Sequence, residues 1–387
     1  MTDRFLTPRR MAVIAGLALL AGCQVVPKPR GPVAPPPPPP PPVSSLPQDA
    51  ERHRVALLVP LTGPNAAVGQ SIANAATMAL LDTNARNLRI TNYDTGADAG
   101  AAASRAVADG NGLILGPLMA QDISQVAAAA RPVDVPVIAF SNDASAASRQ
   151  VFIMGTIPSE SVDRTLRYAA EHGVRSYAAL VPRGEYGQRT SSALLASARR
   201  AGGAVAAMEP YDRGNTSVAS AARRLSDKGG FDAVMIVDGG RIASLAAPQL
   251  RKSANGGPRL LGTELWSGDG VVAANPALRG AWFSALSDTR FRQFSASYKS
   301  RFGAQPYRLA TMGYDAVLLT LRVARDWRPG SPFPLDRLVD PSGFLGLDGA
   351  FRFGPDGVVE RALEVREVRA GGVAVVSPAP ARFGDGG

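Results

Sequence analysis

Short apolar runs alternate with longer, alanine-rich segments along most of this chain, and this alternation constrains the fold more than any other feature. Residues 55–59 form a continuous apolar run that ends before Pro60 and Gly63. Such a run is typical of a strand that is buried on both faces of a parallel sheet. Short strands that alternate with helices predict parallel sheets with right-handed crossovers.

The alternation restarts once, which predicts two α/β lobes. In the first series we expect strands at 55–59, 88–93, 112–115 and 135–140 and helices at 66–81, 99–108 and 121–130. In the second series we expect strands at 176–181, 204–208, 232–237 and 259–261 and helices at 160–172, 188–201, 218–225 and 242–250. Two late helices, 291–302 and 309–326, precede strands at 349–353 and 358–367. Between these strands, Gly-Pro-Asp-Gly at 354–357 predicts a hairpin turn.

Residues 1–22 have the layout of a secretory signal peptide. Arg4, Arg9 and Arg10 precede an apolar stretch at 11–20, which is shorter than the ~20 residues that a membrane-spanning helix needs. The stretch ends in Leu-Ala-Gly followed by Cys23, the only cysteine of the chain. This ending resembles the bacterial lipoprotein box, which implies that Cys23 is lipidated and becomes the first residue of the mature protein. The alternative is an ordinary signal peptide with an incidental cysteine.

Residues 23–51 are rich in proline, with an unbroken run from Pro35 to Pro42. We expect a disordered tether here, because such a segment favours extended polyproline II and cannot form a core. Two explanations of this tether stay open. It can be the ordinary linker of a lipid-anchored protein, or it can allow the folded part to reach a partner away from its membrane. Gln24, in place of Asp after the lipidated cysteine, implies the outer membrane by the usual sorting pattern. The sequence therefore predicts a periplasmic protein that is lipid-anchored to the outer membrane.

The formal charge is +10, and nearly all of the basic residues are arginines spread along the chain. No block of like charges with interleaved aromatics indicates a nucleic-acid surface, so we expect attraction to anionic lipid or cell-wall polymer instead. The only histidines are His53 and His172, and the sequence contains no Gly-x-Ser-x-Gly, phosphate-loop or His-Glu-x-x-His motif. We therefore predict no enzyme activity, no cofactor and no metal site.

Several segments, in order, resemble the type I periplasmic solute-binding fold, and specifically its leucine/isoleucine/valine-binding branch. They are Leu-Val-Pro-Leu-Thr-Gly-Pro at 58–64, Tyr-Asp-Thr at 93–95, Ile-Leu-Gly-Pro at 114–117, Val-Pro-Val-Ile-Ala at 135–139, Glu-Tyr-Gly at 185–187, Gly-Tyr-Asp-Ala at 313–316, and the tail from Gly349 through Phe353 to Gly357. The resemblance implies two doubly wound Rossmann-like lobes joined by three crossovers, near Gly155, Trp282 and Pro329. Lobe 1 would comprise 52–154 plus 284–330, and lobe 2 would comprise 155–283 plus 331–382.

In open parallel sheets, ligands bind beyond the carboxyl ends of the strands. This rule predicts a cleft lined by Thr62, Gly63, Pro64, Gly116, Pro117, Ser141, Asn142, Asp143, Tyr186, Asp238, Gly239, Glu264 and Trp266. Simpler interpretations exist for several of these residues. The glycines can serve only to form turns, Tyr186 can be an aromatic side chain that packs in the core, and Asp94 and Asp315 can cap helices or loops. For Trp266, a stacking platform, a partner contact and a cover over the hinge all stay open.

The resemblance also implies how an amino acid would be held in this cleft. Its carboxylate would bind a Ser or Thr after the Gly-Pro turn and the loop after the fourth strand. Its ammonium would bind an acid a few residues after a Gly-Gly turn. Here the first position is Ala120, the loop is kept at 141–142, and Arg241 follows the Gly-Gly turn. Asp238 or Glu264 could replace the acid, although neither matches it by position.

Two binding functions follow from the resemblance. Residues 136–143, 231–240, 260–266 and 340–353 resemble penicillin-binding protein activators, lipoproteins of this fold that are implied to stimulate a peptidoglycan synthase from the outer membrane. The tether and the missing amino-acid anchors favour this interpretation, although the tether stands where the best-known member has a helical-repeat domain. The alternative is the substrate-binding protein of an ABC transporter, which captures an amino acid or small amide by lobe closure. A cell-wall fragment is a further candidate ligand.

Overall fold

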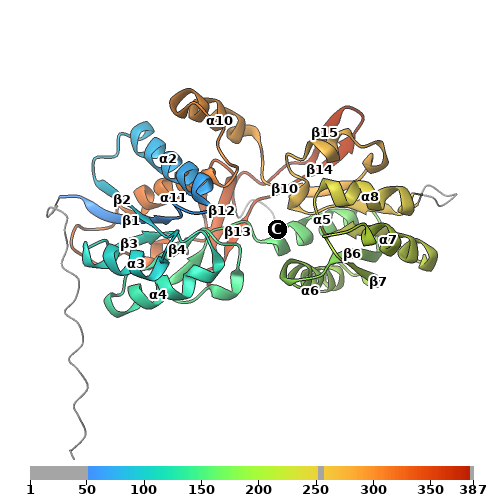
Figure 1. Cartoon of the computed structure of the whole chain (residues 1–387), viewed down its shortest axis with the longest axis horizontal. Helices are drawn as coiled ribbons and strands as arrows, with labels where there is room; N and C mark the ends of the chain where they lie inside the picture. Colours follow the sequence, from blue (N-terminus) through green and yellow to red (C-terminus); the bar gives the residue numbers. More distant parts are fainter. Residues whose placement is uncertain (1–50, 252–256, 384–387) are drawn as a thin grey trace, which may run out of the picture. The chain divides into compact units, whose positions relative to one another are not determined.

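The structure, a computed structural model, describes residues 51–251 and 257–383 (Figure 1). The predicted signal peptide, the lipidation site Cys23 and the predicted tether up to residue 50 lie outside the described residues. None of the helices within the described ranges is long and apolar enough to cross a membrane. The described chain forms the two α/β lobes that the sequence predicts.

The first lobe is built on a five-stranded parallel sheet in the order β2-β1-β3-β4-β5. Its strands are β1 (His53–Val59), β2 (Leu88–Asp94), β3 (Leu113–Leu115), β4 (Val137–Ala139) and β5 (Val151–Ile153). Helices α2 (Ala66–Asp82) and α11 (Ala310–Val323) pack on each other at one face, α3 (Ala99–Ala108) and α4 (Ile123–Ala130) cover the other, and α10 (Thr289–Phe302) packs on α2 (Figure 1). Residues 55–59 are fully buried, as expected of an apolar strand covered on both faces.

The second lobe contains a seven-stranded sheet in the order β15-β14-β10-β9-β8-β6-β7. Its parallel strands are β6 (Ser176–Pro182), β7 (Ala204–Tyr211), β8 (Ala233–Ile236), β9 (Arg259–Leu261) and β10 (Trp282–Ala285); β14 (Glu364–Arg369) and β15 (Gly372–Ser377) add an antiparallel edge. Helices α5 (Pro158–Glu171) and α6 (Glu185–Arg200) cover one face, and α7 (Ser217–Lys228), α8 (Gly240–Leu250) and α9 (Gly270–Ala274) cover the other. Each face therefore has its own buried cluster of side chains.

A third, antiparallel sheet corrects the predicted course of the tail. It consists of β11 (Phe344–Gly346), β12 (Gly349–Phe353) and β13 (Val359–Arg361). Phe351 and Phe353 are buried in the core of the first lobe, and a parallel bridge between Ile153 and Val358 joins this sheet to β5. The resemblance predicts residues 331–382 in lobe 2 and a third crossover near Pro329. Instead, the burial of these aromatic side chains keeps the chain in the first lobe until it crosses between β13 and β14.

Most of the expected elements are present within a few residues of their expected ends. The hairpin at 354–357 is confirmed, because Gly354 N donates to Val358 O (2.9 Å) where β12 and β13 pair. The first two crossovers run at 154–157 and 286–288, close to the predicted Gly155 and Trp282. Sequence patterns do not reveal β5, β10, β11, β15 or α9, and the single strand expected at 358–367 is two strands, because the third crossover interrupts it.

Candidate functional site

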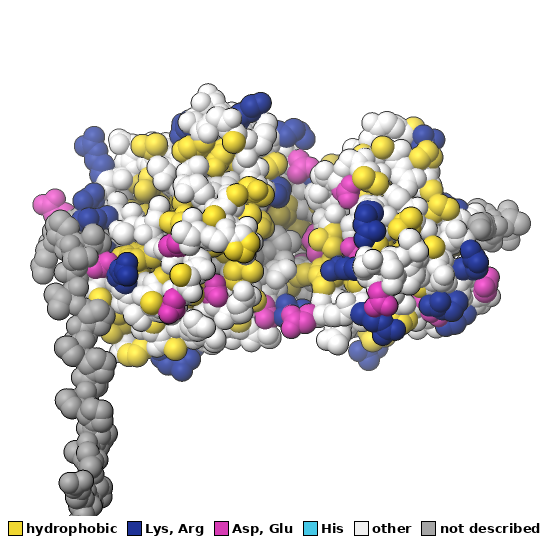
Figure 2. Space-filling model, in the orientation of Figure 1, with side chains coloured by type: hydrophobic (Ala, Val, Ile, Leu, Met, Phe, Trp, Pro, Cys, Tyr) yellow, Lys and Arg dark blue, Asp and Glu magenta, His cyan; other side chains and the backbone are white. Residues whose placement is uncertain are grey.

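A cavity of about 660 Å³, which we call the interlobe cleft, lies at the carboxyl ends of β3, β4 and β9. The first lobe lines it with Asn65, Val68, residues 118–121, residues 140–142, Arg308, Leu309 and Met312. The second lobe and the crossovers line it with Thr156, Glu264, Leu265, Ser267, Ala285 and Leu286. On the face drawn in Figure 2, the surface is hollowed between the two lobes.

The second-lobe wall of the cleft presents a carboxyl group. Glu264 follows β9, and its Oε1 accepts a hydrogen bond from the Tyr186 hydroxyl (2.9 Å), which also lies 3.0 Å from Thr263 Oγ1. The other oxygen, Oε2, is buried and has no hydrogen-bond partner among the described residues. Burial raises the pKa of Glu264 above its ordinary value and also raises the pKa of Tyr186, so the tyrosine keeps its proton as a donor. Glu264 therefore has room for one more hydrogen bond.

The first-lobe wall is formed by the loops after β3 and β4. Ser141 is buried, and its Oγ accepts a hydrogen bond from Asp143 N (3.1 Å). The loop after β3 brings Ala120 to the cleft, where its methyl group cannot hydrogen-bond. Gly116 begins this loop with φ +104°, and a Cβ there would lie 2.0 Å from Leu58 O. Only glycine allows that approach, so Gly116 acts as a turn former.

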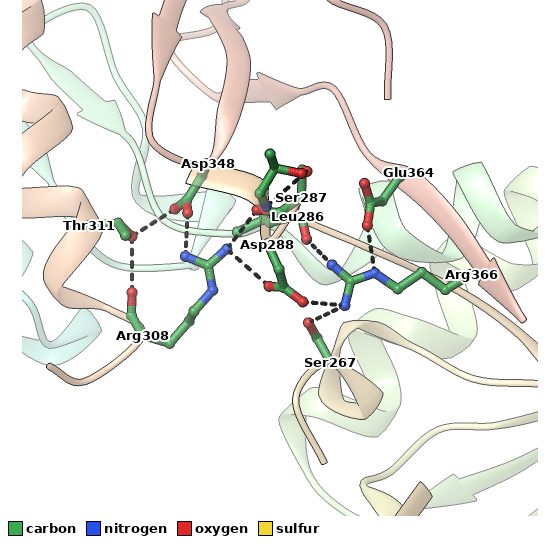
Figure 3. A network of polar contacts seen from close by, with 10 residues as sticks. Ser267, Leu286, Ser287, Asp288, Arg308, Thr311, Asp348, Glu364 and Arg366 are labelled. Atoms are coloured by element: carbon green, nitrogen blue, oxygen red, sulfur yellow. Dashed lines mark hydrogen bonds and ion pairs between the residues drawn. The ribbon is translucent and has the colours of Figure 1, made fainter. Parts of the chain in front are cut away.

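Arg308 lines the cleft, but carboxylates already compensate its charge (Figure 3). It pairs with Asp348, and its Nη2 lies 4.0 Å from Asp288 Oδ1. Asp288 lies in the second crossover, and its Oδ2 is 2.7 Å from Nη1 of Arg366 in the second lobe. Arg366 is only 6% exposed and also pairs with Glu364 (2.7 Å). A chain of ion pairs therefore links a cleft residue of one lobe to β14 of the other.

Of the predicted site residues, Ser141, Asn142 and Glu264 line the cleft. Tyr186 touches it only through its hydrogen bond to Glu264. The residues that are not among those lining the cleft are Thr62, Gly63, Pro64, Gly116, Pro117, Asp143, Tyr186, Asp238, Gly239 and Trp266. Asp143 instead joins the lobes, because its Oδ2 lies 3.0 Å from Arg189 Nη2 of α6.

The loop at 62–64 is fixed by Asp94. Thr62 Oγ1 donates to Asp94 Oδ2 (2.6 Å), and the backbone N–H groups of Leu61 and Gly96 donate to Oδ1 (2.7 and 2.8 Å). Burial acts to raise the pKa of Asp94, but these hydrogen bonds outweigh it and hold the pKa below its ordinary value. Asp94 is therefore a loop cap. Asp315 also has a capping contact, since it accepts a hydrogen bond from Leu347 N (2.7 Å).

Trp266 belongs to the core of the second lobe. It is 1% exposed, its ring centroid lies 5.8 Å from that of Phe283, and its Nε1 donates to Asp238 O (2.7 Å). The Asp238 carboxylate in turn accepts from the Tyr211 hydroxyl (2.8 Å) and pairs with Arg213 (2.7 Å). Both predicted residues are thus engaged in structural contacts, and the burial of Trp266 leaves no exposed ring face for a stacking platform or a partner contact.

The Gly-Gly turn at 239–240 is filled by one of the protein's own carboxylates. Gly240 N donates to Asp269 Oδ2 (2.7 Å) at the start of α8, and a Cβ on Gly240 would lie 2.5 Å from that oxygen. Arg241, which stands where the resemblance implies an acid, donates to Arg213 O (3.0 Å). A helix N-terminus can bind an anion, and here that position holds Asp269.

Sequence reasoning misses the cleft residues contributed by the late helices. Arg308, Leu309 and Met312 stand at or just before the start of α11. The resemblance places this helix in lobe 1, but no pattern in the sequence indicates which of its ends faces the cleft. No group of three or more His, Cys, Asp or Glu residues within the described ranges is arranged to hold a metal ion.

Comparison with known proteins identifies a family. The model of a family described as "Periplasmic binding protein" matches residues 53–372. The uncharacterized protein RP748 of Rickettsia prowazekii (strain Madrid E) is 27% identical over 175 residues, which are 45% of this chain and 47% of that protein. The match thus spans about half the length of this curated relative.

Solved structures resemble the fold along most of the chain. A Rhodospirillum rubrum structure, described provisionally as a branched-chain amino acid ABC transporter, is 22% identical with a TM-score of 0.75 over 84% of this chain and 100% of that one. A substrate-binding protein of Desulfitobacterium hafniense in complex with Leu is 19% identical, with a TM-score of 0.63 over 84% and 100%. A solute-binding protein of Rhodopseudomonas palustris in complex with 3,4-dihydroxy benzoic acid is 19% identical, with a TM-score of 0.62 over 86% and 97%. At these identities the likeness concerns the fold alone.

Proposed function

Since this chain belongs to the periplasmic binding protein family, we propose that it is a non-catalytic binding protein of the cell envelope that captures a small organic molecule in the interlobe cleft. The observation that carries this proposal is Glu264, a residue that lines the cleft and whose buried Oε2 has no hydrogen-bond partner among the described residues. A buried acceptor without a partner costs stability, so a ligand N–H or O–H that supplied one would bind favourably there.

The remaining lining narrows the chemistry of the ligand. Val68, Phe140 and Met312 offer apolar contact, while Ala120 supplies no hydroxyl for a ligand carboxylate. Arg308 is already compensated by carboxylates and attracts an anion only weakly. We therefore propose a ligand with a donor head, such as an amine or amide, and an apolar body. The substrate-binding role of an ABC transporter fits this ligand, as does lobe closure around it.

A second candidate function is regulation of a peptidoglycan synthase, as in penicillin-binding protein activators. The specific observation in its favour is that the cleft lacks two groups expected to bind a free amino acid. Ala120 has no hydroxyl for the carboxylate, and Arg241, which stands in place of the acid for the ammonium, donates to a backbone carbonyl outside the cleft. In this proposal the lobes act as a protein-contact surface. A lipid anchor on Cys23 and location at the outer membrane belong to the same proposal.

A thermal-shift screen tests the first proposal. The whole mature chain with Cys23→Ser is heated with amines, amides, amino acids, aromatic acids and peptidoglycan fragments. A ligand at a hundred times its dissociation constant should stabilise the protein by ~2.7 kcal/mol. We expect amines or amides to raise the melting temperature. Glu264→Gln keeps the shape but replaces one of the two acceptor oxygens by an NH2 group, so it should remove most of that rise.

The control is Glu185→Gln, an exposed carboxyl on α6, which should leave every shift unchanged. A panel without a single stabilising compound would reject capture of a small donor-bearing ligand. A shift with a free amino acid that survives Glu264→Gln would reject the role of Glu264. Stabilisation by wall fragments alone, or co-purification with a peptidoglycan synthase, would favour the second candidate.

A further inference from the structure

A second cavity, which we call the hinge groove, lies on the other side of the crossovers. Its volume is about 940 Å³, and both lobes line it, with residues that include Glu160 and Arg164 of α5 and Arg352 of β12. Among the described residues, none lines both cavities. In the first crossover, Thr156 lines the cleft and its neighbour Ile157 lines the groove. Successive side chains of extended backbone point to opposite sides, so this crossover separates the two cavities.

The last described residues, 378–383, cross this groove, and we call them the C-terminal strap. The strap begins after β15, where Arg164 of α5 donates from Nη2 to Ser377 Oγ (2.5 Å), so its start is held by the second lobe. At its other end, the Phe383 ring centroid lies 4.7 Å from Arg352 Cζ. A Cβ at Gly343 would lie 3.1 Å from Phe383 Cδ2. Since Arg352 and Gly343 belong to the first lobe, the strap connects the lobes in addition to the three crossovers.

The guanidinium group of Arg352 is held in place where Phe383 packs on it. Arg352 donates from Nε to Glu360 Oε2 (2.8 Å), and its Nη2 lies 2.7 Å from the same oxygen. Both elements of this pair belong to one hairpin, so the guanidinium group is held in place before Phe383 packs on it. A guanidinium group over an aromatic face is an attractive cation–π arrangement. Phe383 is half-buried, whereas the preceding Arg382 is exposed.

The strap is short. Pro378 and Pro380 fix two of its backbone torsions, and the described segment 378–380 has no helix or strand structure. Residues 381–383 form bends and a turn, so the strap is not fully extended. Its six residues can span roughly 20 Å at most. A lobe movement that widens the hinge groove beyond this reach must therefore detach Phe383 from Arg352.

We propose that the C-terminal strap is a built-in restraint that opposes closure of the interlobe cleft, an inference that rests on the ligand capture proposed above. The cleft and the groove lie on opposite sides of the same crossovers, so rotation of the lobes that narrows one widens the other. In this structure the strap lines the groove, and Phe383 contacts Arg352. By linkage, whatever releases Phe383 favours the closed form and tightens ligand binding.

Distances between spin labels in the ligand-free protein test the restraint directly. The labels are placed on Ser104→Cys of α3 and Ser220→Cys of α7, exposed positions in different lobes, in the whole mature chain with Cys23→Ser. We expect Phe383→Ala to shift the ratio of closed to open populations by about two- to fivefold, the range that an exposed cation–π contact contributes. Arg352→Met should give the same shift, and the two changes together no more than either one.

Arg382→Ala is the matched control, because it alters the same segment without touching the ring contact, and it should leave the distances unchanged. A chain that ends at Ser377 should reproduce the effect of Phe383→Ala. Distance distributions that are the same in wild type, Phe383→Ala and the shortened chain would overturn the proposal. Because no ligand is present, this result is independent of the ligand screen; a failed screen with shifted distances would reject ligand capture but keep the restraint.

Discussion

Glu160 offers the sharpest test of how burial at the hinge affects stability. It lies in the first turn of α5, and its Oε1 accepts a hydrogen bond from Arg361 N (2.6 Å). Although the residue as a whole is partly exposed, Oε2 is buried and has no hydrogen-bond partner among the described residues. Burial raises the pKa of Glu160 to about 8, against the lowering effects of the Arg361 N–H and guanidinium charge. The carboxyl group therefore carries a proton at neutral pH in the folded protein.

The raised pKa of Glu160 determines whether the free energy of unfolding rises or falls with pH. In the unfolded chain a glutamate ionises near pH ~4.3, so above that pH the unfolded state gains charge while the folded state keeps its proton. The free energy of unfolding then falls by about 1.4 kcal/mol per pH unit until Glu160 ionises in the folded protein. Between pH 5 and pH 7 the loss is about 3 kcal/mol. Glu160→Gln removes this loss, because an amide of the same shape cannot ionise and still accepts from Arg361 N.

The assay is urea unfolding of the wild type and of Glu160→Gln at pH 5, 6, 7 and 8, followed by tryptophan fluorescence. We expect the stability of the variant relative to wild type to rise by about 3 kcal/mol from pH 5 to pH 7 and to level off near pH 8. Glu171→Gln, an exposed change on the same helix, should leave the wild-type pH dependence intact. Parallel stability curves for wild type and Glu160→Gln would refute the burial argument.

Three further changes have definite expected outcomes. Asp269→Ala removes the acceptor for Gly240 N and for Val271 N at the starts of α8 and α9 and should cost about 1–2 kcal/mol, measured by calorimetry; an unchanged melting temperature would contradict this capping role. Trp266→Ala leaves a cavity in the second-lobe core and should cost about 3–5 kcal/mol in urea unfolding, whereas a solvent-exposed platform would lose almost nothing. Cys23→Ser should move the processed protein from the membrane to the soluble periplasmic fraction, and retention in the membrane would reject the lipid anchor.

Much of the fold could be predicted because the central strands are continuous apolar runs. Residues 55–59 are all fully buried, as a strand that is covered on both faces requires. β5 and β10 are only three and four residues long, so an apolar pattern has few positions in which to appear. The tail could not be assigned to a lobe either. Alternation predicts that Phe351 and Phe353 share one buried face, but it does not indicate which core they enter.

The site was less predictable than the fold, for a physical reason. The rule that ligands bind at the carboxyl ends of strands finds Ser141 and Glu264, because each lies two or three residues after the end of a strand. The same rule also selects Trp266, whose side chain turns into the core from a position only two residues farther on. Arg308 precedes a helix that returns to the first lobe after the second crossover, so its position depends on tertiary packing alone.

The lobes are joined mainly by polar contacts, and this bears on how they move. Among the described residues, each of the three large hydrophobic clusters lies within one lobe. The contacts that connect the lobes are polar, and they include Asp143–Arg189, Asp288–Arg366 and Glu160–Arg361. Separating an apolar interface would expose surface at a cost of roughly 25 cal/mol per Å². A partly exposed ion pair such as Asp143–Arg189 costs far less to rearrange, because water replaces the partners that it loses. Where contacts of this kind join the lobes, one aromatic contact of about 0.5–1 kcal/mol at the end of the C-terminal strap is large enough to bias their position.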